Sequence, residues 1–199
     1  MCERHAIGTP SWTGSGKGLR KMTKDKVTDP FPLAMSPPGS EITFITDDLV
    51  KDAIDMSRRS PRLRMIVPLH KSDDANPHRM LNAMQPGSYI RPHRHSHPPK
   101  SETMVVLQGS IAFVVFDEDG EIRDTALLSR ELGTIGVDAE PNIYHTFLVL
   151  EPDTVLFETK PGPYQQALDK EFAEWAPAEG SEKVPEYLTS LRNRIGENG

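Results

Sequence analysis

Apolar side chains are sparse at the start of the chain and become periodic after its first fifth. Residues 1–40 are rich in Gly, Ser, Thr, Pro and Lys. They predict a disordered extension, because so few apolar groups cannot offset the entropy lost on ordering. Residues 41–62 follow, with the alternating segment EITFI (41–45), which predicts a strand. In DDLVKDAIDMSRR (47–59) the apolar side chains fall mostly on one helical face, and Asp47 is placed to cap this predicted helix.

Residues 63–162 are short segments rich in β-branched, aromatic and aliphatic side chains. Turn residues separate them, as in Gln85-Pro86-Gly87 and in DEDG at 117–120. Short strands with turns every 8–12 residues or so are typical of an all-β sandwich or small barrel. Residues 163–199 have a polar, helical pattern, in which PEYLTSLRNR (185–194) predicts a terminal helix. We therefore expect one all-β domain with a short helix before it and a helical tail after it.

Composition and charge narrow the classes of function. The 199 residues suffice for one domain with a substantial apolar core. The chain has 29 acidic and 23 basic side chains, a net charge of −6, which excludes the basic face of a nucleic-acid-binding protein. The single cysteine, Cys2, favours a reducing compartment, and no window approaches the ~20 apolar residues of a membrane helix. We expect a soluble, cytoplasmic protein with no nucleic-acid or membrane partner.

Potential metal ligands are concentrated in RPHRHSHPPKSE. Side chains two positions apart on a strand point to the same face, so His93 and His95 would aim together. Glu102 opens the next apolar segment and can meet these imidazoles if both strands lie in one barrel. His145 is a fourth donor from a later strand. His97 is either a rival or auxiliary ligand or an imidazole on a loop.

These positions resemble the two motifs of the cupin superfamily. The frame G-x5-H-x-H, then Glu, then x6-G is met by Gly87, His93, His95, Glu102 and Gly109. GTIGVDAEPNIYH, ending at His145, resembles the second motif, with Asn142 at the usual turn glycine; Asn tolerates a positive φ better than most residues. In addition SPRLR, PGSYIRPHRH and KPGPYQQALDKEFAEWAPAEG resemble WbuC-type cupin-fold metalloproteins, over roughly residues 45–180. One departure is the gap between His95 and Glu102, which is longer than in the family pattern.

The resemblance implies a single cupin domain, that is, a double-stranded β-helix or jelly-roll barrel. It also implies a divalent transition metal at His93, His95, Glu102 and His145. Three imidazoles and one carboxylate suit Fe(II), Mn(II), Ni(II), Cu(II) or Zn(II) better than Ca or Mg. Cupins frequently pair through an edge strand, so we expect a homodimer, with residues 41–45 as an edge or exchanged strand.

Six further polar side chains are candidates to line the mouth of the site: Arg79, Asn82, Tyr89, Arg91, Tyr144 and Lys160. We expect Tyr89 and Tyr144 to serve as catalytic bases and the other four to bind substrate. If SYIRPH is a strand, Arg91 points inward with His93, which favours a carboxylated or phosphorylated ligand. The alternative is a structural ion pair of Arg91 with Glu158 or another carboxylate.

Three functions stay open on these grounds. The first is a metal-dependent enzyme of the isomerase, epimerase or oxygenase class, acting on a small polar, anionic or sugar-derived molecule; WbuC-type naming implies polysaccharide (O-antigen) biosynthesis. The second is a non-catalytic module that binds a small molecule through the metal. The third is a barrel whose metal is purely structural.

Overall fold

The computed structural model describes residues 31–197, and in this part the chain forms ten strands and two helices. The helices are α1 (Asp47–Arg59) and α2 (Val184–Glu197). The strands are β1 (Arg64–Pro68), β2 (His78–Met84), β3 (His93–Arg94), β4 (Glu102–Gln108), β5 (Ser110–Phe116), β6 (Ile122–Ser129), β7 (Gly136–Ala139), β8 (Tyr144–Val149), β9 (Thr154–Lys160) and β10 (Glu171–Phe172). Neither α1 nor α2 has the length and hydropathy that a membrane span requires.

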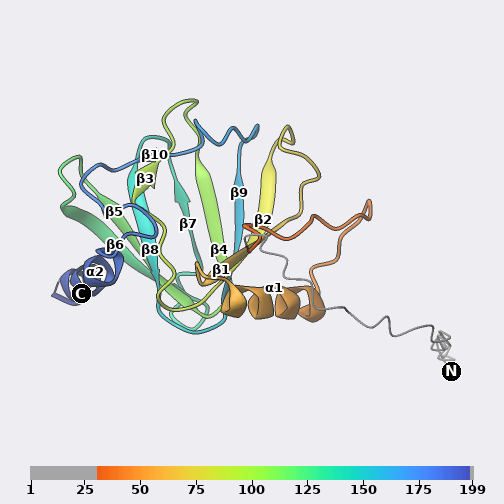
Figure 1. Cartoon of the computed structure of the whole chain (residues 1–199), viewed down its shortest axis with the longest axis horizontal. Helices are drawn as coiled ribbons and strands as arrows, with labels where there is room; N and C mark the ends of the chain where they lie inside the picture. Colours follow the sequence, from red (N-terminus) through yellow and green to blue (C-terminus); the bar gives the residue numbers. More distant parts are fainter. Residues whose placement is uncertain (1–30, 198–199) are drawn as a thin grey trace, which may run out of the picture. The chain divides into compact units, whose positions relative to one another are not determined.

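All strand pairs are antiparallel, and they build two sheets of five strands. The first sheet has the order β1-β2-β9-β4-β7 and the second the order β10-β3-β8-β5-β6. The sheets face each other in a barrel (Figure 1), whose interior holds apolar side chains from both, such as Met104, Leu156, Phe113 and Phe147. The structure confirms the predicted fold class, an all-β jelly-roll barrel of two antiparallel sheets, with a short helix before the barrel and a helix after it.

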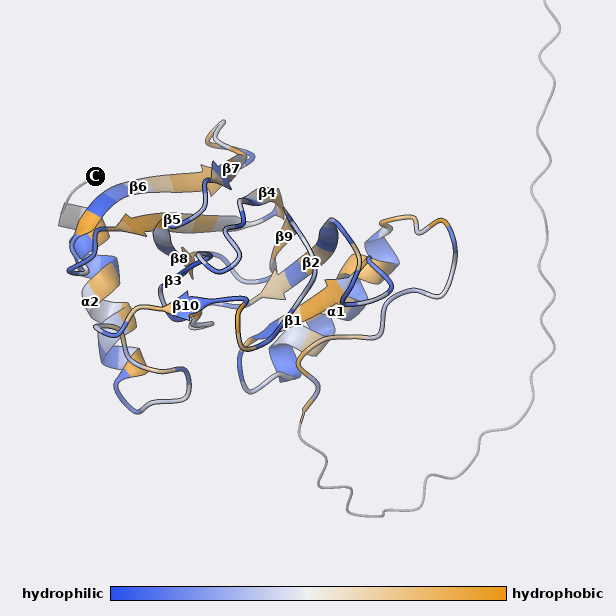
Figure 2. Cartoon of the chain, turned by 90° about the horizontal axis from the view of Figure 1, so that it is seen from above, coloured by the Kyte–Doolittle hydropathy of each residue, from blue (hydrophilic) through white to orange (hydrophobic). Residues whose placement is uncertain are grey.

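Each helix covers the outer face of one sheet, α1 beside β1 and β2 and α2 beside β5 and β8 (Figure 1). Ala53 and Ile54 of α1 pack against the first sheet, and Leu191 of α2 packs against the second. Strands β5 and β8 are therefore buried on both faces, which explains why β5 is almost continuously apolar in sequence. Figure 2 shows the apolar colour along β5, whereas α1 carries both apolar and polar stretches.

The start of the described chain differs from the prediction. Residues 41–45 form no strand, and Ile42 and Phe44 are 72% and 78% exposed. The edge of β1 that could pair with them is already used, because the Met35 amide donates to the Ile66 carbonyl at 2.8 Å. A strand without a neighbouring edge has no partners for its backbone groups. Residues 1–30, which hold most of the predicted extension and Cys2, lie outside the described residues.

Helix α1 begins at the predicted residue, but its cap is different. Thr46, not Asp47, is the N-cap, and its Oγ1 accepts a hydrogen bond from the Leu49 amide at 3.3 Å. Asp47 and Asp48 instead lie in the first turn, where a negative charge interacts favourably with the helix dipole.

The predicted C-terminal tail is helical only from Val184 onward, which confirms the terminal helix but not a helical pattern throughout. Between β9 and α2 the chain is irregular except for β10, which pairs with β3. Pro161 and Pro163 cannot donate the backbone hydrogen bonds that a helix needs. The segment 161–170 connects β9 of the first sheet to β10 of the second and crosses one end of the barrel (Figure 1).

Candidate metal centre

The four predicted ligands meet at the end of the barrel that segment 161–170 crosses. One donor atom from each of His93, His95, Glu102 and His145 lies within 4.8 Å of the others. All four side chains are buried, with exposed fractions between 2% and 5%. His93 lies on β3 and His95 directly after it, Glu102 lies on β4 and His145 on β8. All four side chains face the interior of the barrel. In β4, for example, the buried residues alternate as Glu102, Met104 and Val106, so Glu102 begins a row of side chains that face the barrel interior.

Local backbone geometry brings these strands into register. His93 of β3 pairs directly with His145 of β8. The turn before β8 holds Asn142 at a φ of 68°, as its place in the motif predicted, and the Asn142 amide donates to the His95 carbonyl at 3.2 Å. At the far end of β4, Gly109 has a φ of 74°, and a Cβ there would lie 2.4 Å from Oγ1 of Thr154. The motif residues at these two turns are therefore required by the backbone.

The tautomers of the three imidazoles follow from their contacts. Each Nδ1 lies at hydrogen-bond distance from a backbone carbonyl: that of Arg91 for His93 at 3.0 Å, that of Ile143 for His145 at 2.9 Å, and that of Asp169 for His95. A carbonyl oxygen only accepts, so each Nδ1 carries the hydrogen and donates it. Each Nε2 then presents a lone pair toward the centre, as in histidines that bind metals.

Two of the three imidazole nitrogens that face the centre have no hydrogen-bond partner in the described part of the chain. Nε2 of His93 and Nε2 of His95 are buried without a hydrogen-bond partner among residues 31–197. Nε2 of His145 lies 3.0 Å from Oε2 of Glu102, and Nε2 of His95 lies 3.6 Å from the same oxygen. A neutral His145 with its hydrogen on Nδ1 cannot donate to this oxygen, so the close contact is stabilised either by a second proton on the imidazole or by a cation bound to both atoms. Donors about 2.1 Å from a divalent transition ion and at right angles would be about 3 Å apart, which is the separation of Nε2 of His145 and Oε2 of Glu102.

The protonation states also suit a metal. Burial, with a smaller effect from the Lys170 charge, holds the pKa of His93 well below its usual value, so this imidazole is neutral at pH 7. Burial has the largest single effect on Glu102 and raises its pKa, but the charge of Lys160 and the contacts with His145 and His95 together outweigh burial and hold this pKa well below the usual range. The centre therefore offers a neutral imidazole and an ionised carboxylate, the forms in which these groups bind metals.

Lys160 lies beside the centre, bound to carboxylates. Its Nζ lies 3.5 Å from Oε1 of Glu102, 3.4 Å from Oε1 of Glu158 and 3.3 Å from Oδ2 of Asp169. Asn82 is one step further away and donates from Nδ2 to Oε2 of Glu158 at 2.7 Å. Burial, together with the nearby charge of Glu102, raises the pKa of Glu158 to about 7. Two predicted substrate-binding residues, Lys160 and Asn82, thus belong to a network that surrounds Glu102.

Asp169 and Lys100 are part of this network and were missed in the sequence. The Asp169 carbonyl accepts from His95, while its carboxylate contacts Lys160 and, at 3.5 Å, Nζ of Lys100. Lys100 also donates to the Pro163 carbonyl at 2.7 Å, and it lies in the long gap between His95 and Glu102. No local pattern marks these residues, because apart from the contact of Asp169 with Lys160 their partners lie 63 to 74 positions away in the sequence. In the sequence, the unusually long gap between His95 and Glu102 was the one feature that indicated additional residues around the site.

The structure places the predicted bases away from the four donors. Tyr144 precedes His145 on β8 and points to the opposite, outer face, where its hydroxyl donates to Glu171 at 3.3 Å. The hydroxyl of Tyr89 donates to the Pro177 carbonyl at 2.8 Å, and its ring contacts Tyr187 of α2. Burial raises the pKa of both Tyr89 and Tyr144. Neither is placed to exchange a proton with a ligand on the metal.

The predicted arginines and His97 are also outside the centre. Residues 88–92 form no strand, so the alternation that placed Arg91 inward does not apply; its guanidinium donates to the Ala173 carbonyl at 2.6 and 3.0 Å. Arg79 lies on β2 and is exposed. The imidazole of His97 is 84% exposed and lies 2.9 Å from Oγ of Ser96, so it is a loop residue and not a ligand.

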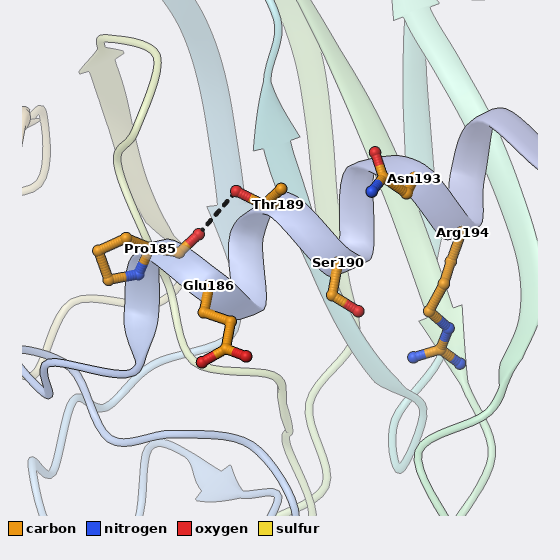
Figure 3. Close-up of a pocket in the computed structure, with 6 residues that line it drawn as sticks. All are labelled: Pro185, Glu186, Thr189, Ser190, Asn193 and Arg194. Atoms are coloured by element: carbon orange, nitrogen blue, oxygen red, sulfur yellow. Dashed lines mark hydrogen bonds between the residues drawn. The ribbon is translucent and has the colours of Figure 1, made fainter.

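A hollow of about 620 Å³ lies along α2, outside the barrel, and is unrelated to this centre (Figure 3). It is lined by residues of that helix alone: Pro185, Glu186, Thr189, Ser190, Asn193 and Arg194. Its Thr189 hydroxyl donates to the Pro185 carbonyl of the same helix at 2.9 Å. None of the four metal donors contributes to it.

Comparison with known proteins gives a family match over part of the chain. A family model described as a domain of unknown function, DUF6016, matches residues 45–128, which include His93, His95 and Glu102 but not His145. A comparison with curated proteins gave no match. The fold and the inward donors define the described chain as an all-β, two-sheet barrel with a candidate metal centre.

Several solved structures are similar to this chain. The capsular polysaccharide assembling protein CapF from Staphylococcus aureus has 20% identity and a TM-score of 0.46, over 55% of this chain and 29% of CapF. The L-ribose isomerase from Geodermatophilus obscurus has 12% identity and a TM-score of 0.46, over 57% of this chain and 70% of the isomerase. KdgF from Halomonas sp. has 21% identity and a TM-score of 0.38, over 52% of this chain and 80% of KdgF. The chain thus matches less than a third of the length of CapF.

Proposed function

We propose that this chain binds a divalent transition metal through His93, His95, Glu102 and His145 and uses it to hold a small polar or anionic, saccharide-type molecule. The observation that carries the proposal is the convergence of four buried side chains, three imidazoles and one carboxylate, whose donor atoms lie within 4.8 Å of one another. Four protein donors leave two positions on a six-coordinate ion. An ion bound in this way can polarise a ligand oxygen or activate water.

The saccharide part of the proposal is supported by the resemblance to WbuC-type cupins, in particular by SPRLR and by KPGPYQQALDKEFAEWAPAEG. The same resemblance supports polysaccharide biosynthesis as the process in which the chain acts, and an isomerase, epimerase or oxygenase as its enzyme class. The single cysteine supports the cytoplasm as the compartment.

A second candidate function is a non-catalytic binding module. It is favoured by the position of Tyr89 and Tyr144, because an isomerase or epimerase needs a base near the metal and both tyrosines are bound elsewhere. In this alternative the ion would orient a ligand without converting it.

Metal content tests the site. We expect one transition ion per chain in the purified wild-type protein, measured by inductively coupled plasma mass spectrometry. His95→Ala should lose the ion, whereas His97→Ala, which changes the exposed imidazole two positions away, should retain it. A wild-type protein that takes up no transition metal would overturn the proposal.

Two further measurements separate the candidate functions. Proton relaxation of water with Mn(II) in the site should show exchangeable water, whereas a closed, structural ion would show none. Incubation with a panel of nucleotide sugars and sugar acids should then give turnover for an enzyme and binding alone for a module. His95→Ala is the control in both experiments.

We also propose that the chain forms a homodimer through residues 41–45. Ile42, Phe44 and Ile45 are 72%, 78% and 46% exposed, and their alternating sequence suits a strand that has no partner within residues 31–197. Light scattering coupled to size-exclusion chromatography should give the mass of a dimer, and Phe44→Ser should shift it toward the monomer. A wild-type monomer at high concentration would contradict this arrangement.

A further inference from the structure

The two carboxylate oxygens of Glu102 face different partners. Oε2 lies 3.0 Å from Nε2 of His145 and 3.6 Å from Nε2 of His95, on the side of the candidate metal. Oε1 lies 3.5 Å from Nζ of Lys160. Both Glu102 and Lys160 are buried, so bulk water does not compete for this ion pair. One oxygen is thus directed to the imidazoles and the other to an ammonium.

The register of the first sheet accounts for this contact. Glu158 of β9 lies opposite Met104 of β4 in an antiparallel pair, next to the pair of Leu156 with Val106. Leu156 and Met104 both belong to the apolar interior of the barrel, and side chains two positions apart share a face. Lys160 and Glu102 each lie two positions further along their strands, so they emerge beside each other on the interior side.

Two further carboxylates hold the Lys160 ammonium in place. Its Nζ lies 3.4 Å from Oε1 of Glu158 and 3.3 Å from Oδ2 of Asp169. Glu158 is itself fixed, because its Oε2 accepts a hydrogen bond from Nδ2 of Asn82 at 2.7 Å. If Lys160 turned away, three buried carboxylates would lose a partner of opposite charge, which is costly. The environment of Oε1 of Glu102 is therefore set by residues outside the four donors.

An ion pair at Oε1 decides how Glu102 can bind a metal. A carboxylate binds an ion through one oxygen or through both. Binding through both would require Oε1 to turn from Lys160 toward the ion and to give up the ammonium. Binding through Oε2 alone keeps the ion pair. In that case the four protein residues leave two positions on a six-coordinate ion, and otherwise they leave one.

We infer that Lys160 is a positioning residue that keeps Glu102 a one-oxygen ligand and so preserves the second open position on the metal. This inference rests on the proposed function, since it concerns the proposed ion. A molecule that binds through two neighbouring oxygens, as a hydroxy acid or a pair of saccharide hydroxyls does, needs both positions. Lys160, which the sequence analysis gave a role in binding substrate, thus selects the class of ligand through Glu102.

The number of exchangeable waters on Mn(II) tests the inference, measured by water proton relaxation after metal content has shown that each protein is loaded. The wild type should have about two waters, as expected for four protein donors on a six-coordinate ion. Lys160→Met keeps the four donors but should have about one water, because Glu102 is then free to bind through both oxygens. Lys100→Met is the matched control and should keep about two. Lys100 is also a buried lysine of the network, but its contacts among residues 31–197 are with Asp169 and the Pro163 carbonyl.

Two anions of equal charge separate the lost position from the lost charge. Glycolate binds a metal through two oxygens, whereas azide occupies one position. In calorimetric titrations of the Mn(II)-loaded proteins, Lys160→Met should weaken glycolate binding about tenfold or more, an effect typical of losing a residue that orients a metal ligand. Azide binding should change much less. An equal loss for both anions would mean that Lys160 acts through its charge alone and would overturn the inference.

The outcomes also separate this inference from the proposal beneath it. A wild type that takes up no Mn(II) would overturn the proposed function, and the inference with it. A loaded wild type with about one exchangeable water, or the same two waters in wild type and Lys160→Met, would overturn the inference alone. Loss of the second water in Lys100→Met as well would assign the effect to the network at large and would also overturn it.

Infrared difference spectroscopy of the wild type covers the case in which Lys160→Met does not fold. When Mn(II) binds, the antisymmetric and symmetric stretching bands of one carboxylate should move apart, which is the signature of coordination through one oxygen. Glu102→Gln, which removes this carboxylate, identifies the bands. Bands that move together, as they do when both oxygens bind the ion, would overturn the inference.

Discussion

The two ends of the barrel interior are built from the same strands but stabilised in opposite ways. On β8, His145 is followed two positions later by Phe147, and on β4, Glu102 is followed by Met104. One end, here called the donor end, buries His93, His95, Glu102 and His145 together with the network around Lys160. The other, the apolar end, buries a cluster that includes Met104, Leu156 and Phe147.

This difference shows how one alternating strand can serve both packing and chemistry. At the apolar end burial is itself favourable, because apolar surface leaves water. At the donor end burial is costly, and each charge needs a partner of opposite sign to be retained. The ends should therefore respond differently to substitution, to metal and to pH.

The largest effect is expected from Lys160→Met, studied in the metal-free protein. The change leaves Glu102, Glu158 and Asp169 buried without the ammonium that contacts all three. Removing one partner of a buried ion pair costs about 3–5 kcal/mol, so the free energy of unfolding at pH 7 should fall by that amount. Urea denaturation measures it.

Addition of Mn(II) should recover part of this loss, because the ion supplies positive charge next to Glu102. Lys51→Met is the control and should stay within about 0.5 kcal/mol of the wild type, as an exposed substitution does. A Lys160→Met protein as stable as the wild type in the absence of metal would show that the donor end does not depend on paired charges.

At the apolar end, Leu156→Ala should lower the free energy of unfolding by about 2–5 kcal/mol, since this fully buried side chain leaves a cavity. In contrast to Lys160→Met, the loss should not depend on metal or on pH. Leu168→Ala, at a site that is 48% exposed, should have little effect. A loss at Leu156 that Mn(II) reverses would break the distinction between the two ends.

A smaller effect is expected at the turn that leads into β8. Asn142 has a φ of 68°, so Asn142→Ala should cost about 1 kcal/mol, the strain of an ordinary side chain in the left-handed region. Asn142→Gly should be neutral or slightly stabilising. Thermal unfolding of the two variants measures the difference. Equal melting temperatures for the alanine and glycine variants would contradict a role for this backbone conformation.

The smallest effect concerns Glu171, on the outer side of the donor end. A hydrogen bond from Arg94 is the largest cause that lowers the pKa of Glu171, to about 2. A lowered carboxyl pKa stabilises the fold above its usual value near 4.5, and this contribution is lost as the pH falls toward 2. The glutamate is 38% exposed, so solvent screening limits the contribution to about 1 kcal/mol or less.

Glu171→Gln should therefore be less stable than the wild type at pH 6, and the gap should narrow at pH 4 and again at pH 3. Urea denaturation at the three pH values gives this comparison. A gap that stays constant over this range would mean that Glu171 acts through packing and not through its charge.

Much of the fold could be predicted from the sequence because the relevant signals are local. The helical face of residues 47–59, the terminal helix and the series of short apolar strands each arise from neighbouring residues. The strand predicted at 41–45 does not form, although its local pattern alternates, and the neighbouring edge of β1 pairs with Ala34 and Met35 instead. Whether an apolar alternation becomes a strand depends on a partner elsewhere in the chain.

The sequence by itself determined the four donors, since the spacing of His93, His95 and Glu102 and the later His145 form a recognisable frame. It also determined the turn at Asn142, because few residues accept a positive φ. Only the tertiary structure decided what surrounds the donors. Asp169 reaches the centre because segment 161–170 crosses the barrel end. Tyr89, Tyr144 and Arg91 are turned away because their partners lie in residues 171–177. Those contacts join positions far apart in sequence, so no local pattern encodes them.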